Sequence, residues 1–192
     1  MADRYVNNAP FINKWFYITG AFGEHRTGHV HTGLDLAPTG FEGNLYAIAE
    51  MKVIYRGYDP DGFGYYIIMR NEYSNIMFLY AHMFDLSDVK PIGYTYQRDE
   101  FVGKAGRSGS ATGVHLHLAM QYGSTWNYSN DINDYIDPTS YLTEIDNIAT
   151  YNTRYYYEGQ PTPPHPTTKK IKRFPFYIYK AMSFDNNDKN II

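Results

Sequence analysis

Short apolar and aromatic segments alternate with turn-forming residues along the middle of the chain. Such segments are typical of β-strands when glycine, proline, asparagine or aspartate bounds them. The segments with this pattern are residues 46–49, 52–56, 65–69 and 76–82. A strong turn signal, DPDGFG, occupies residues 59–64, and only residues 137–142 resemble the start of a short helix. The pattern predicts a mainly β protein with antiparallel sheets joined by tight turns.

The sequence HLHLAM, which begins at His115, alternates strictly between two sets of side chains. On a strand His115 and His117 share one face, whereas on a helix they would diverge by about 200°. The other face of the strand then carries Leu116, Leu118 and Met120. We therefore expect the apolar face to pack into the core and the two histidines to line a groove.

A second motif, HTGLD, places His31 and Asp35 four positions apart around Gly33. On an extended segment both side chains can share a face, and Gly33 leaves the path to a metal ion open. Two imidazoles and a carboxylate are the ligand set of a catalytic zinc that keeps one position open for water. His82, at the end of the strand predicted over residues 76–82, adds a histidine that is free to handle protons. We interpret the chain as a zinc hydrolase.

The composition narrows the ligand types and the class of protein. Cysteine is absent, so any transition metal must be held by histidine and carboxylate. The 21 Tyr and 11 Phe favour β structure, and the net charge of −3 gives no reason to expect nucleic-acid binding. The first residues lack the pattern of a signal peptide, and no apolar run approaches the roughly 18 residues that span a bilayer. We expect a soluble protein of the virion or the extracellular space.

The character of the sequence changes after about residue 158. Residues 159–166, GQPTPPHP, are typical of a linker in the polyproline conformation, and a basic run follows at residues 169–173. The remaining segment is too short for a core of its own. We therefore expect one metal-binding domain over residues 1–158 and a proline-rich linker with a C-terminal tail over residues 159–192.

Several stretches together resemble the lysostaphin-like zinc endopeptidases of the M23 family, which cut the peptide cross-links of bacterial cell walls. HTGLD at 31–35 resembles the family's His-x-Gly-x-Asp motif, YAHM at 80–83 its Tyr-x-His-Leu motif, and HLH at 115–117 its closing motif. Residues 18–26, ITGAFGEHR, are similar to the segment that leads to the first motif. The resemblance spans residues 18 to about 120. It implies a compact antiparallel β domain with an open substrate groove.

The resemblance also implies residue roles. His31, Asp35 and His117 would bind one zinc ion per chain, while His82 and His115 would be catalytic without binding the metal. One neutral histidine accepts the proton of the attacking water and later delivers one to the leaving amine. The other stabilises the oxyanion. Which of His82 and His115 is the general base stays open.

The family implies peptidoglycan cross-link peptides as the substrate. The appended tail and the missing export signal favour a virion-borne enzyme, similar to the cell-wall-cutting domain of tail-tip proteins in small Bacillus phages, with other tail proteins as partners. The alternative is a catalytically inactive lysostaphin-like module that binds or builds a phage tail, although all five key residues are retained. Strand packing is the simpler expectation for Tyr46, Tyr80 and Tyr122, which are also candidates to line the groove.

Overall fold

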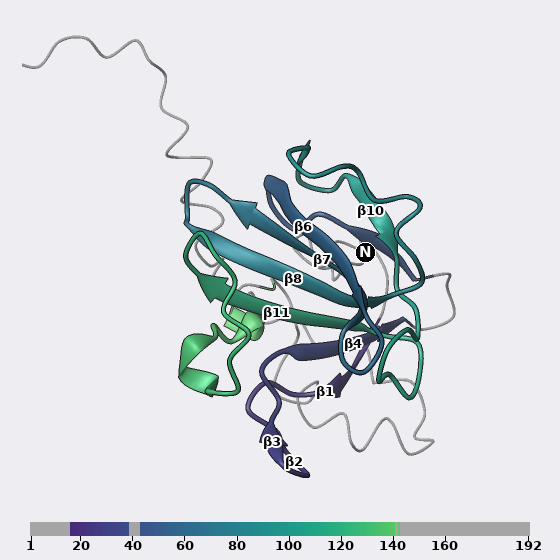
Figure 1. Ribbon diagram of the computed structural model, residues 1–192, viewed down its shortest axis with the longest axis vertical. Helices are drawn as coiled ribbons and strands as arrows, with labels where there is room; N and C mark the ends of the chain where they lie inside the picture. The colour runs from purple at the N-terminus through teal and green to yellow at the C-terminus, as the bar shows by residue number, and fades with distance from the viewer. Residues whose placement is uncertain (1–15, 39–42, 141, 143–192) are drawn as a thin grey trace, which may run out of the picture.

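Antiparallel strands account for nearly all regular structure in the computed structural model, which describes residues 16–38, 43–140 and 142 (Figure 1). Seven strands form one sheet in the order β1-β4-β11-β8-β7-β6-β9. They are β1 (Phe16–Gly20), β4 (Leu34–Pro38), β11 (Leu116–Tyr122), β8 (Ile76–Met83), β7 (Gly64–Asn71), β6 (Met51–Asp59) and β9 (Thr95–Tyr96). Two short pairs accompany the sheet, β2 (His25–Arg26) with β3 (His29–Val30) and β5 (Asn44–Tyr46) with β10 (Phe101–Lys104). The predicted fold class, mainly β and antiparallel, is confirmed.

Most of the predicted strands lie where the sequence pattern places them: residues 52–56 in β6, 65–69 in β7 and 76–82 in β8. The prediction of a strand over residues 46–49 is wrong, because β5 ends at Tyr46. The backbone N–H of Ala47 donates to the carbonyl of Glu100, and the N–H of Asp99 donates to the carbonyl of Ala47. The residues after Tyr46 are buried all the same, so their apolar character reflects burial in a loop.

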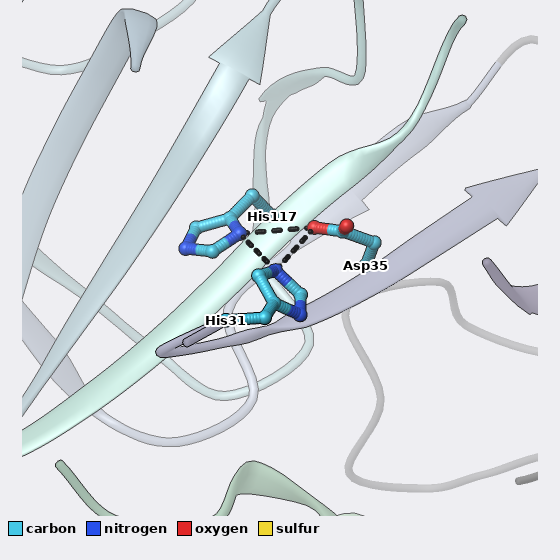
Figure 2. Close-up of side chains that lie close together, drawn as sticks. All are labelled: His31, Asp35 and His117. Carbon is cyan, nitrogen blue, oxygen red and sulfur yellow. Dashed lines mark hydrogen bonds and ion pairs between the residues drawn. The ribbon is translucent and has the colours of Figure 1, made fainter. Parts of the chain in front are cut away.

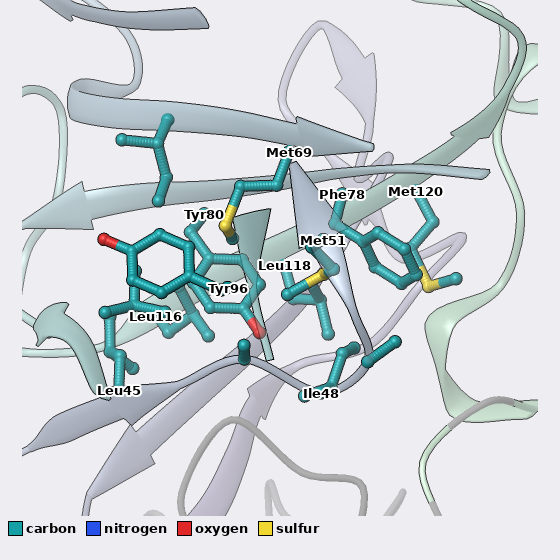
Figure 3. Packing of buried hydrophobic residues seen from close by; sticks show 14 of the residues in the cluster. Leu45, Ile48, Met51, Met69, Phe78, Tyr80, Tyr96, Leu116, Leu118 and Met120 are labelled. Carbon is teal, nitrogen blue, oxygen red and sulfur yellow. The ribbon is translucent and has the colours of Figure 1, made fainter. Parts of the chain in front are cut away.

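The main hydrophobic core lies on one face of the large sheet (Figure 3). Leu116, Leu118 and Met120 of β11 all point into it, which confirms the predicted alternation. Full burial of an aliphatic side chain of this size contributes roughly 1.5–3 kcal/mol. The opposite face of the sheet carries a smaller apolar cluster, to which β8 contributes Met77, Leu79 and Ala81. Because β8 is covered on both faces, its sequence is a continuous apolar run.

Two 3-10 turns follow the last described strand, Ile132–Asp134 and Pro138–Ser140, and the second lies in the segment where a short helix is predicted. Within the described ranges, no helix combines the length and the apolar character needed to cross a membrane. The tail over residues 159–192 and its boundary at residue 158 lie outside the described residues. The division into domain and tail therefore stays a prediction.

Candidate metal centre

Three side chains from distant parts of the chain meet on the sheet face opposite the main core (Figure 2). His31 Nε2 lies 3.1 Å from Asp35 Oδ1 and 3.0 Å from His117 Nδ1. His117 Nδ1 lies 2.9 Å from the same Asp35 oxygen. The exposed fractions of the three residues are only 3%, 6% and 6%. Among the described residues this is the one group of histidine and acidic side chains arranged to hold a metal ion.

Strand pairing sets Asp35 directly against His117. The two residues are 82 positions apart in sequence, yet they are opposite each other in the register of the antiparallel strands β4 and β11. His31 lies just before β4, where its backbone N–H donates to the carbonyl of Glu24 (2.8 Å). A Cβ at Gly33 would overlap the imidazole of His117. Gly33 therefore makes room for the ring of His117, whereas the prediction that it keeps the path to a metal open stays a prediction.

The donor atoms fit a bound cation. His31 Nδ1 donates to the carbonyl of Ala21 (2.8 Å), so its Nε2 presents a lone pair to the centre. That lone pair faces a carboxylate oxygen and a second imidazole nitrogen in a buried space, where like-charged acceptors repel unless a cation or a proton lies among them. Nε2 of His117 is buried with no hydrogen-bond partner in the described structure. Two imidazoles and one carboxylate are a known three-residue ligand set for zinc with an open position.

The two oxygens of Asp35 have different partners. Burial alone would raise the pKa of this carboxyl, but hydrogen bonds and charge interactions with His117 and His31 outweigh it and hold the pKa well below its usual value. While Oδ1 faces the histidines, Oδ2 accepts a hydrogen bond from Arg26 Nη2 at 2.6 Å. A Cβ at Gly20 would overlap both the carboxylate and the guanidinium. Gly20 is therefore required for this ion pair.

Two further histidines border His31, Asp35 and His117. The rings of His82 and His115 lie 4.8 Å apart, and the ring of His82 lies 6.0 Å from that of His117. Nε2 of His115 lies 3.7 Å from Asp35 Oδ1, while its Nδ1 donates to the carbonyl of Gly113 (2.9 Å). The structure therefore brings together all five residues that the sequence singles out.

His82 is held by the loop that precedes β11. Its Nδ1 donates to the carbonyl of Ser108 (2.9 Å), which leaves Nε2 unprotonated when the ring is neutral. Burial, together with the nearby charges of His117 and His115, lowers the pKa of His82 to about 4. The backbone of His82 has φ of 58°, in the left-handed region that non-glycine residues rarely adopt. Such local strain is typical of functional positions.

Sequence reasoning missed two neighbours of the centre, and its simpler expectation for Tyr80, strand packing, is confirmed. Arg26 has a signal only as the end of the segment similar to the M23 family, and Phe63 has none beyond its place in a turn. The ring of Phe63 lies 5.9 Å from that of His117. Tyr80 is fully buried in the main core and donates to the carbonyl of Tyr46, so it packs as a strand residue and cannot line a groove.

Comparison with known proteins gives one family and a set of similar folds. The sequence model of Peptidase family M23 matches residues 29–132. The catalytic domain of lysostaphin from Staphylococcus simulans aligns with 65% of this chain and 90% of its own, at 21% identity and a TM-score of 0.54. The catalytic domain of the prophage-encoded M23 protein EnpA from Enterococcus faecalis aligns with 70% of this chain and 97% of its own, at 24% identity and a TM-score of 0.54. A zinc-containing peptidase from Vibrio cholerae aligns over 70% of this chain but only 38% of its own, at 25% identity and a TM-score of 0.52.

Proposed function

The chain belongs to peptidase family M23, and on this basis we propose that it is a zinc-dependent endopeptidase that hydrolyses the peptide cross-links of bacterial peptidoglycan. The observation that carries the proposal is the convergence of His31, Asp35 and His117 within hydrogen-bond distance of one another. The zinc-containing peptidase among the similar structures supports the choice of metal. The similarity in fold to the lysostaphin catalytic domain supports a wall peptide as the substrate.

The ligands in this proposal are Nε2 of His31, Oδ1 of Asp35 and Nδ1 of His117. A zinc ion in such a site supplies Lewis acidity, which polarises the carbonyl of the scissile bond. Asp35 enters the site ionised, because its pKa is far below neutral. His117 enters it neutral, since burial lowers its pKa, against the opposing effect of Asp35. Both ligands therefore have a free lone pair at neutral pH.

His82 and His115 handle protons in the proposed reaction. His82 keeps its hydrogen on Nδ1, against the carbonyl of Ser108, so that Nε2 can accept a proton from the attacking water. His115 likewise keeps a hydrogen on Nδ1, and its Nε2 lies beside the carboxylate of Asp35. Because Nδ1 of both rings donates to a backbone carbonyl, the hydrogen bonds do not decide which of the two histidines is the general base. One serves as base and then acid to the leaving amine, and the other stabilises the oxyanion.

Two measurements on the full chain test the function. Metal analysis of the purified protein should give one zinc per chain. Purified cell walls of different cross-link types, digested with the protein, should release new amino groups at one type of peptide bond, and a chelator should stop the release. Cleavage by a rigorously metal-free protein would refute zinc dependence. A zinc-loaded, folded protein that cleaves no wall type would instead favour the inactive binding or structural module.

We extend the proposal to the setting in which the enzyme acts, as a phage tail-associated enzyme that opens the cell wall during infection. The similar fold of a prophage-encoded M23 protein supports this setting. Mass spectrometry of purified virions tests it. We expect the chain among the tail proteins, and its absence from intact particles would point to a free lytic enzyme.

A further inference from the structure

A row of aromatic rings leads away from the metal centre across the sheet face that carries it. The row begins at Phe63, whose ring lies 5.9 Å from that of His117. From Phe63 it continues to Tyr66 at 5.6 Å and to Tyr128 at 6.5 Å between ring centroids. Tyr55 of β6 ends the row, with its ring 5.4 Å from that of Tyr66. We call these four residues, Phe63, Tyr66, Tyr128 and Tyr55, the aromatic row.

The members of the row are fixed relative to one another. The hydroxyl oxygens of Tyr66 and Tyr128 are 3.0 Å apart and share a hydrogen bond. Tyr128 lies on the segment after β11, which the side chain of Gln121 fastens. Gln121 Nε2 donates to the backbone carbonyl of Asn127 (2.7 Å), and Gln121 Oε1 accepts a hydrogen bond from the backbone N–H of Asn127 (2.9 Å). The row is therefore a preformed surface, which keeps the entropic cost of binding low.

The row carries no charged side chain, and it is exposed at two of its members, whereas Tyr66 between them is buried at 6% exposure. Tyr55 is 43% exposed and Tyr128 is 58% exposed. The ring of Tyr55 lies over Gly57, in the space that a Cβ there would need. Burial, with the hydrogen bond from Tyr128, raises the pKa of Tyr66, so that its hydroxyl stays protonated.

The charged group closest in sequence to the row is Arg56, next to Tyr55, but its guanidinium donates to the backbone carbonyls of Leu86 and Val89 (both 2.8 Å). The charged groups that come next in sequence are carboxylates. Asp61 lies two residues before Phe63, and Asp131 lies three residues after Tyr128. A carboxylate placed on the row would lose part of its hydration, gain no cation from these neighbours and face like charges. The surface is suited to peptide planes, small apolar side chains and amides, which aromatic rings and hydroxyl groups can contact together.

We propose that the aromatic row binds an uncharged stretch of the substrate peptide that leads away from the scissile bond, and that it discriminates against a free carboxylate in that stretch. The inference rests on the proposed peptidase function, because only a substrate bound at the metal centre would continue onto Phe63. Binding to the row needs no catalysis, so it can be measured separately.

The test is an NMR titration of the full, metal-free chain with two probes, acetyl-Ala-Gly-Ala-Gly-amide and the same peptide with a free terminal carboxylate. We expect ring signals of Phe63, Tyr66 and Tyr128 to shift, with the amide bound about fivefold more tightly than the acid. Tyr128→Ala should weaken binding of the amide by about five- to tenfold. Tyr73→Ala, which removes an exposed tyrosine from the turn at the far end of β7, is the matched control and should leave the affinity unchanged.

Asp61→Asn tests the origin of the discrimination, since it removes a charge without removing a ring. This variant should reduce the difference in binding affinity between the amide probe and the acid probe. Three results of the titration would overturn the proposal: equal affinity of the wild-type protein for both probes, shifts confined to other residues, or no shift up to about 10 mM peptide. It would also be overturned if a wall disaccharide shifted the ring signals of the row while neither peptide did. An inactive protein that binds the amide at the row refutes only the peptidase function. An active enzyme whose Tyr128→Ala variant binds and cleaves like wild type refutes only this inference.

Discussion

Arg26 and Asp35 form an ion pair in which Nη2 of the guanidinium lies 2.6 Å from Oδ2 of the carboxylate, the oxygen that His31 and His117 do not contact. Arg26 belongs to the exposed hairpin of β2 and β3, whereas Asp35 is buried in β4. The pair ties one carboxylate oxygen to the hairpin and leaves the other for the proposed zinc ion. Outer groups of this kind orient a metal ligand and tune its affinity.

Arg26→Met should therefore weaken zinc binding while the fold is retained. The loss of an outer hydrogen bond to a ligand typically lowers metal affinity by about 10- to 100-fold, and we expect an effect of that size in competition with a chromogenic chelator. Arg70→Met, which removes a partly exposed arginine from β7, is the matched control. An unchanged zinc affinity in Arg26→Met would show that the register of β4 alone orients Asp35.

The three proposed ligands should behave as one set. His31→Ala, Asp35→Ala and His117→Ala should each remove most of the zinc, because two remaining ligands hold the ion poorly. Metal analysis after dialysis measures the loss, and circular dichroism shows whether each variant has folded. Full retention of zinc by any folded member would remove that residue from the ligand set.

His82→Ala and His115→Ala should show the opposite combination. Neither residue is a ligand in our proposal, so zinc should stay near one per chain. The rate of cross-link cleavage should fall by about a hundredfold or more, the scale of lost acid–base catalysis. If either folded variant no longer binds about one zinc per chain, the division between ligands and catalytic residues is wrong.

Acid should destabilise the metal-free protein in a window set by His82. Its pKa is about 4 in the folded state against 6.5 for an ordinary histidine, so between these values the unfolded chain binds more protons. The free energy of unfolding should fall as the pH drops from 6.5 towards about 4, by up to about 1.4 kcal/mol per pH unit for this residue. The lowered pKa of His117 acts in the same direction, and the carboxylate of Asp35 adds a loss below pH 3.8.

Urea unfolding of chelator-treated protein at several pH values measures this dependence. His82→Asn should give a shallower slope, and asparagine tolerates the left-handed backbone at this position. His29→Asn, in the exposed hairpin, is the matched control. Equal slopes for wild type and His82→Asn would mean that His82 titrates alike in both states.

Truncation after Tyr157 should preserve zinc binding and cleavage of a small soluble cross-link peptide. The proline-rich stretch separates residues 159–192 from the motifs, and no proposed ligand lies beyond it. We expect any loss to concern attachment to whole walls or assembly into a particle, where the basic run at 169–173 can meet anionic groups. A folded truncation that loses both zinc and peptide cleavage would show that the tail helps to build the site.

The sequence alone identifies the strands that alternate or are covered on both faces, because burial imposes a local pattern on β8 and β11. It also places His115 and His117 on one face, since a two-residue spacing has only that outcome on a strand. Residues 46–49 mislead for the same reason. A buried loop can be as apolar as a strand, and its backbone hydrogen bonds to Asp99 and Glu100 have no sequence signal.

Contacts between distant segments could not be predicted from the residues themselves. The pairing of Asp35 with His117 depends on the register between β4 and β11, and a shift by one residue would turn Asp35 to the other face. The position of Arg26 depends on the hairpin of β2 and β3, whose strands are only two residues long. The position of Phe63 depends on the conformation of the turn between β6 and β7. The resemblance to the M23 family supplies the proposed ligand set, because its motifs join residues that lie far apart in the chain.

β11 is the last strand along the chain within the described residues, yet it lies inside the seven-stranded sheet, between β4 and β8. During synthesis, the strands on both sides of β11 are made before it: β1 and β4 on one side, and β8, β7 and β6 on the other. Until β11 inserts, the edges of β4 and β8 that it will pair with are open to aggregation or to a chaperone. Until residue 117 has left the ribosome and β11 has inserted, Asp35 lacks its histidine partner across the strands. Under the proposed function, a nascent or half-folded chain would be unable to cleave peptides, and activity would begin only when the sheet is complete.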